Sequence, residues 1–144
     1  MSTQRILVQM DDRPWTWRAL TQACQEAQES NASIVLVKLL PQDYLAWICD
    51  DCNAYVFTAA DTEDIRDYQD LADSYEVPLS IRVFEYHDLA QGIVKAADEL
   101  GAESVYAVVP PSAIPFMHDA PLLQLEHALH EHHHELHAVA VAIP

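Results

Sequence analysis

The sequence predicts an α/β domain built on an open five-stranded parallel sheet with helices on both faces. Short apolar runs rich in β-branched residues alternate with longer segments whose apolar residues recur every three or four positions. Such alternation is typical of βαβ units, whose right-handed crossovers produce a parallel sheet. The 144 residues, 51% of them hydrophobic, suit a single domain that spans residues 1–144.

The first βαβ unit is expected at the start of the chain. Residues 6–10 form a short apolar run that predicts a buried strand. Apolar side chains at helical spacing predict a helix over residues 15–30, and Pro14 suits its first turn. Residues 33–40 form the second apolar run and predict a second strand, which Pro41 stops.

An irregular segment separates this unit from the next helix. Residues 42–60 hold several aromatic side chains and predict a loop that covers part of the domain. A helix is expected over residues 62–75, with Asp61 or Thr62 as its N-cap. The apolar residues of 79–84 then predict a third strand.

The third helix carries clear signals at both of its ends. Asp88 and Gln91 fit a variant capping box, and Gly101 stands where a C-terminal cap glycine belongs. These signals predict a helix over residues 89–100. The β-branched run at 104–109 predicts the fourth strand.

The last part of the chain is expected to hold one helix and one strand. Residues 110–121 contain four prolines and predict a loop. Leucines at helical spacing predict a helix over residues 122–135. Residues 138–143 alternate alanine with valine or isoleucine and predict the fifth strand.

The charge balance restricts the classes of partner. The chain carries 23 acidic and 7 basic residues, a formal charge of −16. Such a surface repels nucleic acids and anionic membranes, so neither is expected as a partner. No apolar run is long enough to span a bilayer, and residues 6–8 are too short for a signal peptide, so we expect a cytoplasmic protein. No catalytic motif stands out, which favours a protein that is not an enzyme.

Two segments resemble the universal stress protein family. Residues 6–20 match its opening strand, aspartate, turn and Arg-Ala-Leu-bearing helix, and residues 90–105 look like its Ala-Glu-Leu-Gly-Ala-Asp segment before the fourth strand. The order of elements agrees over essentially the whole chain. The resemblance implies the fold of the adenine-nucleotide alpha-hydrolase type, which is shared by members that bind ATP.

The glycine-rich loop of that family is missing here. In ATP-binding members the loop after the fourth strand follows the pattern Gly, two residues, Gly, nine residues, Gly, then Ser or Thr. Glycine lets backbone N–H groups approach a phosphate without a Cβ in the way. Here residues 108–121 contain no glycine, and each of the four prolines lacks an N–H donor. We therefore expect no ATP at this loop.

One residue of the family's nucleotide site is retained. The resemblance places Asp11 at the position whose aspartate lies near the adenine. We favour a structural role instead, in which Asp11 ends the first strand and caps the first helix. An adenosine-like ligand at the carboxyl ends of the strands stays open, because open parallel sheets bind ligands there.

Histidines gather near the C-terminus. In a helix, His127, His130, His134 and His137 would fall on one stripe away from the leucine face. Such a stripe is either a solvated polar face that gains charge near about pH 6 or a site for Zn²⁺ or Ni²⁺. The polar face is favoured, so no cofactor is expected.

The pair Cys49-Asp-Asp-Cys52 is the other candidate for metal or redox chemistry. A Cys-x-x-Cys pair can supply half a zinc site or a redox dithiol. No second pair exists, and the intervening aspartates disfavour a thiolate. Two partly buried thiols in the covering loop are the favoured interpretation.

The resemblance also implies a homodimer. In the family the fifth strand lies at the sheet edge and mediates dimer formation, which points to Val139, Val141 and Ile143 as interface residues. The leading hypothesis is a regulatory, stress-response dimer that does not bind ATP and acts through protein contacts. The alternatives are an adenine-nucleotide sensor that uses Asp11, and a metal- or redox-responsive binder that uses the histidines or the cysteine pair.

Overall fold

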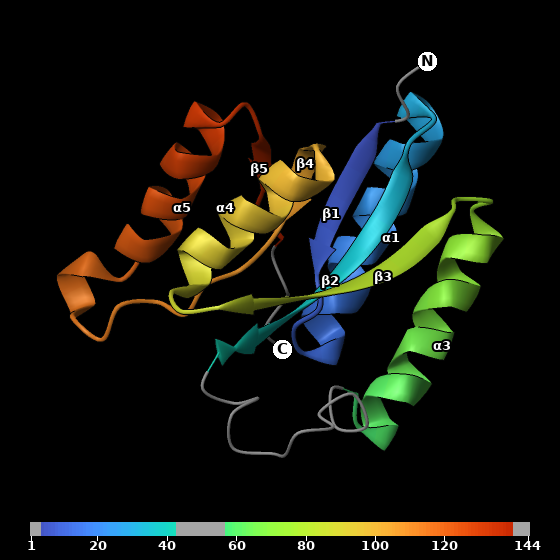
Figure 1. Cartoon of the computed structure of the whole chain (residues 1–144), viewed down its shortest axis with the longest axis horizontal. Helices are drawn as coiled ribbons and strands as arrows, with labels where there is room; N and C mark the ends of the chain where they lie inside the picture. The colour runs from blue at the N-terminus through green and yellow to red at the C-terminus, as the bar shows by residue number, and fades with distance from the viewer. Residues whose placement is uncertain (1–3, 43–56, 140–144) are drawn as a thin grey trace.

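The computed structural model describes residues 4–42 and 57–139, which form a parallel sheet of the order β3-β2-β1-β4-β5 (Figure 1). The strands are β1 (Arg5–Gln9), β2 (Ser33–Pro41), β3 (Leu79–Tyr86), β4 (Ala102–Tyr106) and β5 (Glu135–His137). The helices are α1 (Arg13–Ser30), α3 (Ala59–Ser74), α4 (Leu89–Leu100), the 3₁₀ helix η2 (Pro115–Met117) and α5 (Ala120–Glu131). The predicted fold class is confirmed.

Alternate residues of the strands pack into two separate hydrophobic cores, one on each face of the sheet. On one face, Ile6 and Ile34 pack against Leu20 of α1 and Tyr68 of α3. On the other face, Leu7 and its neighbours pack against α4 and α5 (Figure 1). The two cores follow from the two-residue period of a strand, because a buried parallel sheet must be apolar on both sides. No helix in the described ranges has the length and hydropathy that crossing a membrane requires.

Helix α1 begins two residues earlier than predicted and α3 three residues earlier, because their capping residues lie upstream. The Asp12 side chain accepts a hydrogen bond from the backbone N–H of Trp15, 2.9 Å away, and so caps α1. Thr58 caps α3, and Asp61 bonds back to the Thr58 N–H in a complete capping box. The predicted cap at Asp61 or Thr62 is therefore wrong.

The helix α4 is confirmed at both ends. The Asp88 carboxylate accepts from the backbone N–H of Gln91 at 3.0 Å. Gly101 ends the helix in the left-handed conformation, with φ of 64°. Its neighbours β3 and β4 differ from their predicted ranges, since β3 runs on to Tyr86 and β4 ends at Tyr106.

The last helix and strand are displaced from their predicted ranges of 122–135 and 138–143. His133 adopts the left-handed conformation with φ of 66°, and the His134 N–H closes back onto the Leu129 carbonyl at 2.8 Å. This is a Schellman ending, in which a histidine occupies the place usually taken by glycine. The chain therefore turns early, so that β5 lies at residues 135–137, and residues 138 and 139 are not part of a strand.

Candidate functional site

The sheet order places a topological switch point between β1 and β4. Chain connections leave these neighbouring strands in opposite directions, and open parallel sheets bind ligands at such a point. Here Gln9, the last residue of β1, is only 4% exposed. Its side-chain oxygen accepts a hydrogen bond from the backbone N–H of Val108 at 2.8 Å. One amide donor at the start of the loop after β4 is therefore already used by the protein.

The loop after β4 is held by its own hydrogen bonds. The Ser112 N–H donates to the His118 carbonyl at 3.2 Å, and the Met117 N–H donates to the Ile114 carbonyl at 2.9 Å. The Ile114 N–H in turn donates to the Ser112 hydroxyl at 3.2 Å. Several donors that a phosphate cradle could use are therefore already bonded within the protein, and the prolines of the loop have none to offer.

The same loop presents apolar side chains at the surface. Phe116 is 88% exposed, and Ile114 and Met117 are 46% and 42% exposed. Leu123, one turn into α5, is 60% exposed. Together these four residues form what we call the apolar patch. Sequence reasoning missed it, because the position of an apolar residue in a loop does not reveal whether the side chain is buried.

Asp11 lies at the mouth of the switch point and is exposed. Its backbone N–H donates to the buried hydroxyl of Thr16 at 2.9 Å. The side chain that caps α1 belongs to Asp12 and not to Asp11, so the predicted capping role is wrong. A role for Asp11 at an adenine stays a prediction.

The four predicted histidines do not form one helical stripe. Only His127 and His130 lie on α5, because the helix ends before the other two. His134 follows the turn, and His137 lies on β5, where its ring stacks on Tyr106 with centroids 4.6 Å apart. The shared-face argument for a metal site is therefore wrong.

His134 acts as a clasp between α4, β4 and the last turn. Its ring is 8% exposed, with Nδ1 against the Ala102 carbonyl and Nε2 2.7 Å from the Asp98 carboxylate. His132 also reaches Asp98, at 2.9 Å. Hydrogen bonds from His134 and His132 hold the pKa of Asp98 below its usual range, against the opposing effect of burial. Both ring nitrogens of His134 are thus engaged and neither is free to bind a metal.

A second clasp joins α1 to the C-terminal strand. The Tyr106 hydroxyl donates to the Glu26 carboxylate at 2.9 Å. Burial, with the nearby charge of Glu26, raises the pKa of Tyr106. Nε2 of His137 lies 3.2 Å from the same carboxylate, an ion-pair distance without hydrogen-bond alignment. These contacts link α1 to β4 and place His137 of β5 beside the same carboxylate.

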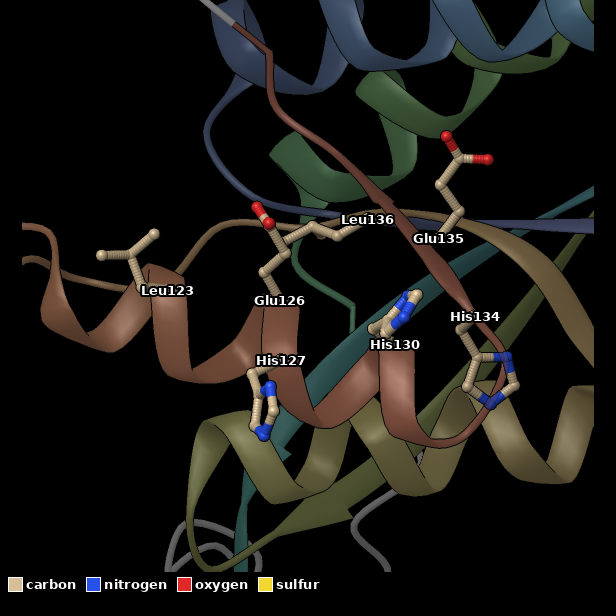
Figure 2. Close-up of a pocket in the computed structure, with 7 residues that line it drawn as sticks. All are labelled: Leu123, Glu126, His127, His130, His134, Glu135 and Leu136. Carbon is tan, nitrogen blue, oxygen red and sulfur yellow. The ribbon is translucent and has the colours of Figure 1, made fainter.

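A hollow of about 460 Å³ lies between α5 and β5. Figure 2 shows Leu123 and Glu126 projecting from one side of α5, with His127 pointing to the other side. The lining residues are Leu123, Glu126, His127, His130, His134, Glu135 and Leu136. Within residues 4–42 and 57–139, no three His, Cys, Asp or Glu side chains are arranged to hold a metal ion.

Several predicted residues cannot be placed. Cys49 and Cys52 lie outside the described residues, as do Val141 and Ile143. Val139 follows β5 and packs against the core beneath α1 and α3. It therefore contributes to the fold of its own chain. The strand predicted at residues 138–143 would have carried Val139, but the observed β5 ends at His137.

Comparison with known proteins identifies the fold. No model of a protein family matches the chain, and no curated protein matches its sequence. A universal stress protein crystallised with cAMP is 19% identical with a TM-score of 0.66, covering 99% of this chain and 100% of its own. A universal stress family protein from Burkholderia pseudomallei is 20% identical with a TM-score of 0.62, at 96% coverage of both chains. A universal stress protein from Archaeoglobus fulgidus in complex with dAMP is 15% identical with a TM-score of 0.59, covering 97% of this chain and 100% of its own. The chain therefore has the universal stress protein fold.

Proposed function

We propose that this chain is a regulatory protein of the universal stress type that acts through protein contacts as a homodimer, without binding ATP and without being an enzyme. The observation that carries the proposal is the loop after β4, in which several amide donors bond within the protein while apolar side chains are exposed. A segment built this way favours contact with a protein over contact with a triphosphate.

The homodimer part of the proposal rests on the position of β5. Among the described strands, β5 lies at one edge of the sheet and pairs only with β4. The outer edge of a strand offers backbone groups to a second chain. Sedimentation equilibrium over a range of protein concentrations tests this, and a monomer at every concentration would contradict it.

The second candidate function is the binding of an adenine nucleotide that has fewer phosphates than ATP. Two proteins of the same fold were crystallised with cAMP and with dAMP. Asp11 is exposed beside the switch point, where such a ligand would lie. A single phosphate needs fewer amide donors than three, so the closed loop weighs less against it than against ATP.

A thermal-shift screen separates these functions. A ligand present at a hundred times its Kd stabilises a protein by about 2.7 kcal/mol, which a melting curve detects. We expect no shift with ATP, and the cAMP-binding relative serves as the positive control. A shift with AMP or cAMP that disappears in Asp11→Asn would favour the nucleotide sensor. Zn²⁺ is included to test the remaining histidines and the cysteine pair, and stabilisation by ATP above all other ligands would overturn the proposal.

A further inference from the structure

The largest exposed apolar side chains of the C-terminal half lie close together. Phe116, Met117 and Leu123 line one hollow of about 350 Å³, together with Asp119. Leu123 also lines the hollow of about 460 Å³ between α5 and β5. The apolar patch therefore continues directly into the second hollow, with Leu123 as the shared wall.

The second hollow is lined by two carboxylates and by three histidines, His127, His130 and His134, with no lysine or arginine among its lining residues. Glu126 and Glu135 line it from α5 and β5 (Figure 2). Residues 96–144 contain no lysine or arginine at all, although they contain seven aspartates and glutamates. The acids of the hollow thus have no lysine or arginine partner within their own part of the chain.

The seven basic residues of the chain lie elsewhere and several are already paired. Arg13 binds Asp64 and Asp67 at 2.5 and 2.8 Å. Lys38 pairs with Asp61. A second copy of the chain therefore has few free basic side chains that could pair with Glu126 and Glu135, and a separate, more basic partner suits this hollow better.

We propose that the apolar patch and the adjoining hollow form one docking surface for a basic amphipathic segment of a partner protein. Apolar side chains of the segment would cover Phe116 and Leu123, and a lysine or arginine would enter the hollow beside Glu126 and Glu135. This combination fits the amphipathic helix-in-groove mode of recognition. The proposal rests on the proposed function and names the contact surface and the chemistry of the partner.

A labelled model peptide tests the surface. The probe is an amphipathic helix of about 18 residues made of leucine and lysine, with a fluorescent label, titrated with the full chain. One comparison peptide replaces each lysine with glutamate, and another replaces each leucine with serine. We expect the leucine–lysine peptide alone to bind, because it alone satisfies both parts of the surface.

Paired variants show where the peptide binds. We expect Phe116→Ser with Leu123→Ser to weaken binding about tenfold or more, since anchoring aromatic and apolar side chains dominate interface affinity. We expect Glu126→Gln with Glu135→Gln to weaken binding and to reduce its salt dependence. The matched control for charge is Glu63→Gln with Asp70→Asn. Both residues are exposed on α3, so the control makes the same change in net charge at a distance from the docking surface. The mutated side chains are exposed or line a surface hollow, and urea unfolding verifies that each variant folds.

Four outcomes would overturn the proposal. They are a peptide that does not bind, equal binding by the leucine-free peptide, equal loss of affinity in the α3 control, and conversion of a dimer to a monomer by the Phe116 and Leu123 changes. The last outcome would assign the patch to a second copy of the chain. The nucleotide screen is independent of these results, so ATP binding would refute the proposed function while leaving the peptide result to judge the surface.

Discussion

The hydrogen bond between the Gln9 side chain and the Val108 N–H joins the end of β1 to the loop after β4, and its contribution to stability can be measured. Gln9→Met keeps the length and approximate volume of the side chain but removes the oxygen that accepts from the Val108 N–H. The glutamine is buried, and the bond joins residues 99 positions apart in the sequence. The substitution therefore leaves the Val108 amide, at the start of the loop after β4, without its partner.

The expected loss follows from the partial burial of that donor. A buried donor left unsatisfied costs about 1–3 kcal/mol. Because the bond is only partly buried, water can reach the Val108 N–H, and we expect a loss of about 1–2 kcal/mol in the free energy of unfolding. Replacing glutamine by methionine at a well-packed site adds little strain of its own.

Urea unfolding followed by tryptophan fluorescence measures this loss. The matched control is Gln28→Met, which removes a bond of similar length, 2.8 Å to the Tyr75 carbonyl, from an exposed site. We expect the control to change the free energy of unfolding by less than about 0.5 kcal/mol. If both variants lose the same free energy, the buried bond has no special role and the reasoning fails. We also expect Gln9→Met not to bind ATP, since the prolines and internal bonds of the loop remain.

Three further predictions follow from the packing and the ionisable groups. Gly92→Ala would place a Cβ 2.6 Å from Cβ of Tyr86, so we expect a loss of about 1–3 kcal/mol in urea unfolding. The hydrogen bond from His134 lowers the pKa of Asp98. The Asp98 carboxylate therefore stabilises the fold fully above its unfolded pKa of about 3.9. This contribution is lost as the pH falls through the lower pKa of the folded state. Asp98→Asn should therefore flatten the acid limb of a stability–pH profile, and an unchanged limb would contradict the clasp. Burial raises the pKa of Cys24 to about 11, so mass spectrometry after iodoacetamide treatment near pH 8 should find Cys24 unlabelled until urea unfolds the chain.

The elements that the sequence predicted well are those whose signals are local. Both ends of α4 follow from Asp88 and Gly101, since a capping carboxylate and a left-handed glycine act within one turn of the helix. Strands β1 to β4 follow from β-branched runs that a doubly covered sheet requires, whereas β5 has no such run and lies outside its predicted range. Local chemistry of this kind is readable because the interacting atoms are close in the sequence.

The parts of the candidate site that sequence reasoning missed depend on distant contacts. The bonds of Gln9 to Val108 and of His134 to the Ala102 carbonyl join residues 99 and 32 positions apart. The histidine stripe failed for the same reason. His134 leaves the helix to reach Asp98, and only the packing of α5 on α4 reveals that this partner exists.

The scarcity of glycine has a structural consequence that bears on the loop after β4. Three helices end with a non-glycine residue in the left-handed conformation, namely Asn31, Glu76 and His133, and each ending closes with a Schellman hydrogen bond. With only two glycines, this chain accepts the cost of the left-handed conformation at the ends of three helices. Lack of glycine after β4 is therefore weak evidence against nucleotide binding when taken alone.

Stronger evidence against nucleotide binding comes from the hydrogen bonds that the backbone N–H groups of the loop make. A chain that tolerates left-handed asparagine, glutamate and histidine could have kept free N–H groups after β4 without any glycine. Instead, the N–H groups of Val108, Ser112 and Ile114 are each bonded to atoms of the protein. A triphosphate would have to displace those bonds before it gained any of its own, and it would still meet the prolines, which have none to offer. The hydrogen bonds of the loop therefore support the proposal that the chain does not bind ATP, and three of the four residues of the apolar patch are exposed on the same loop.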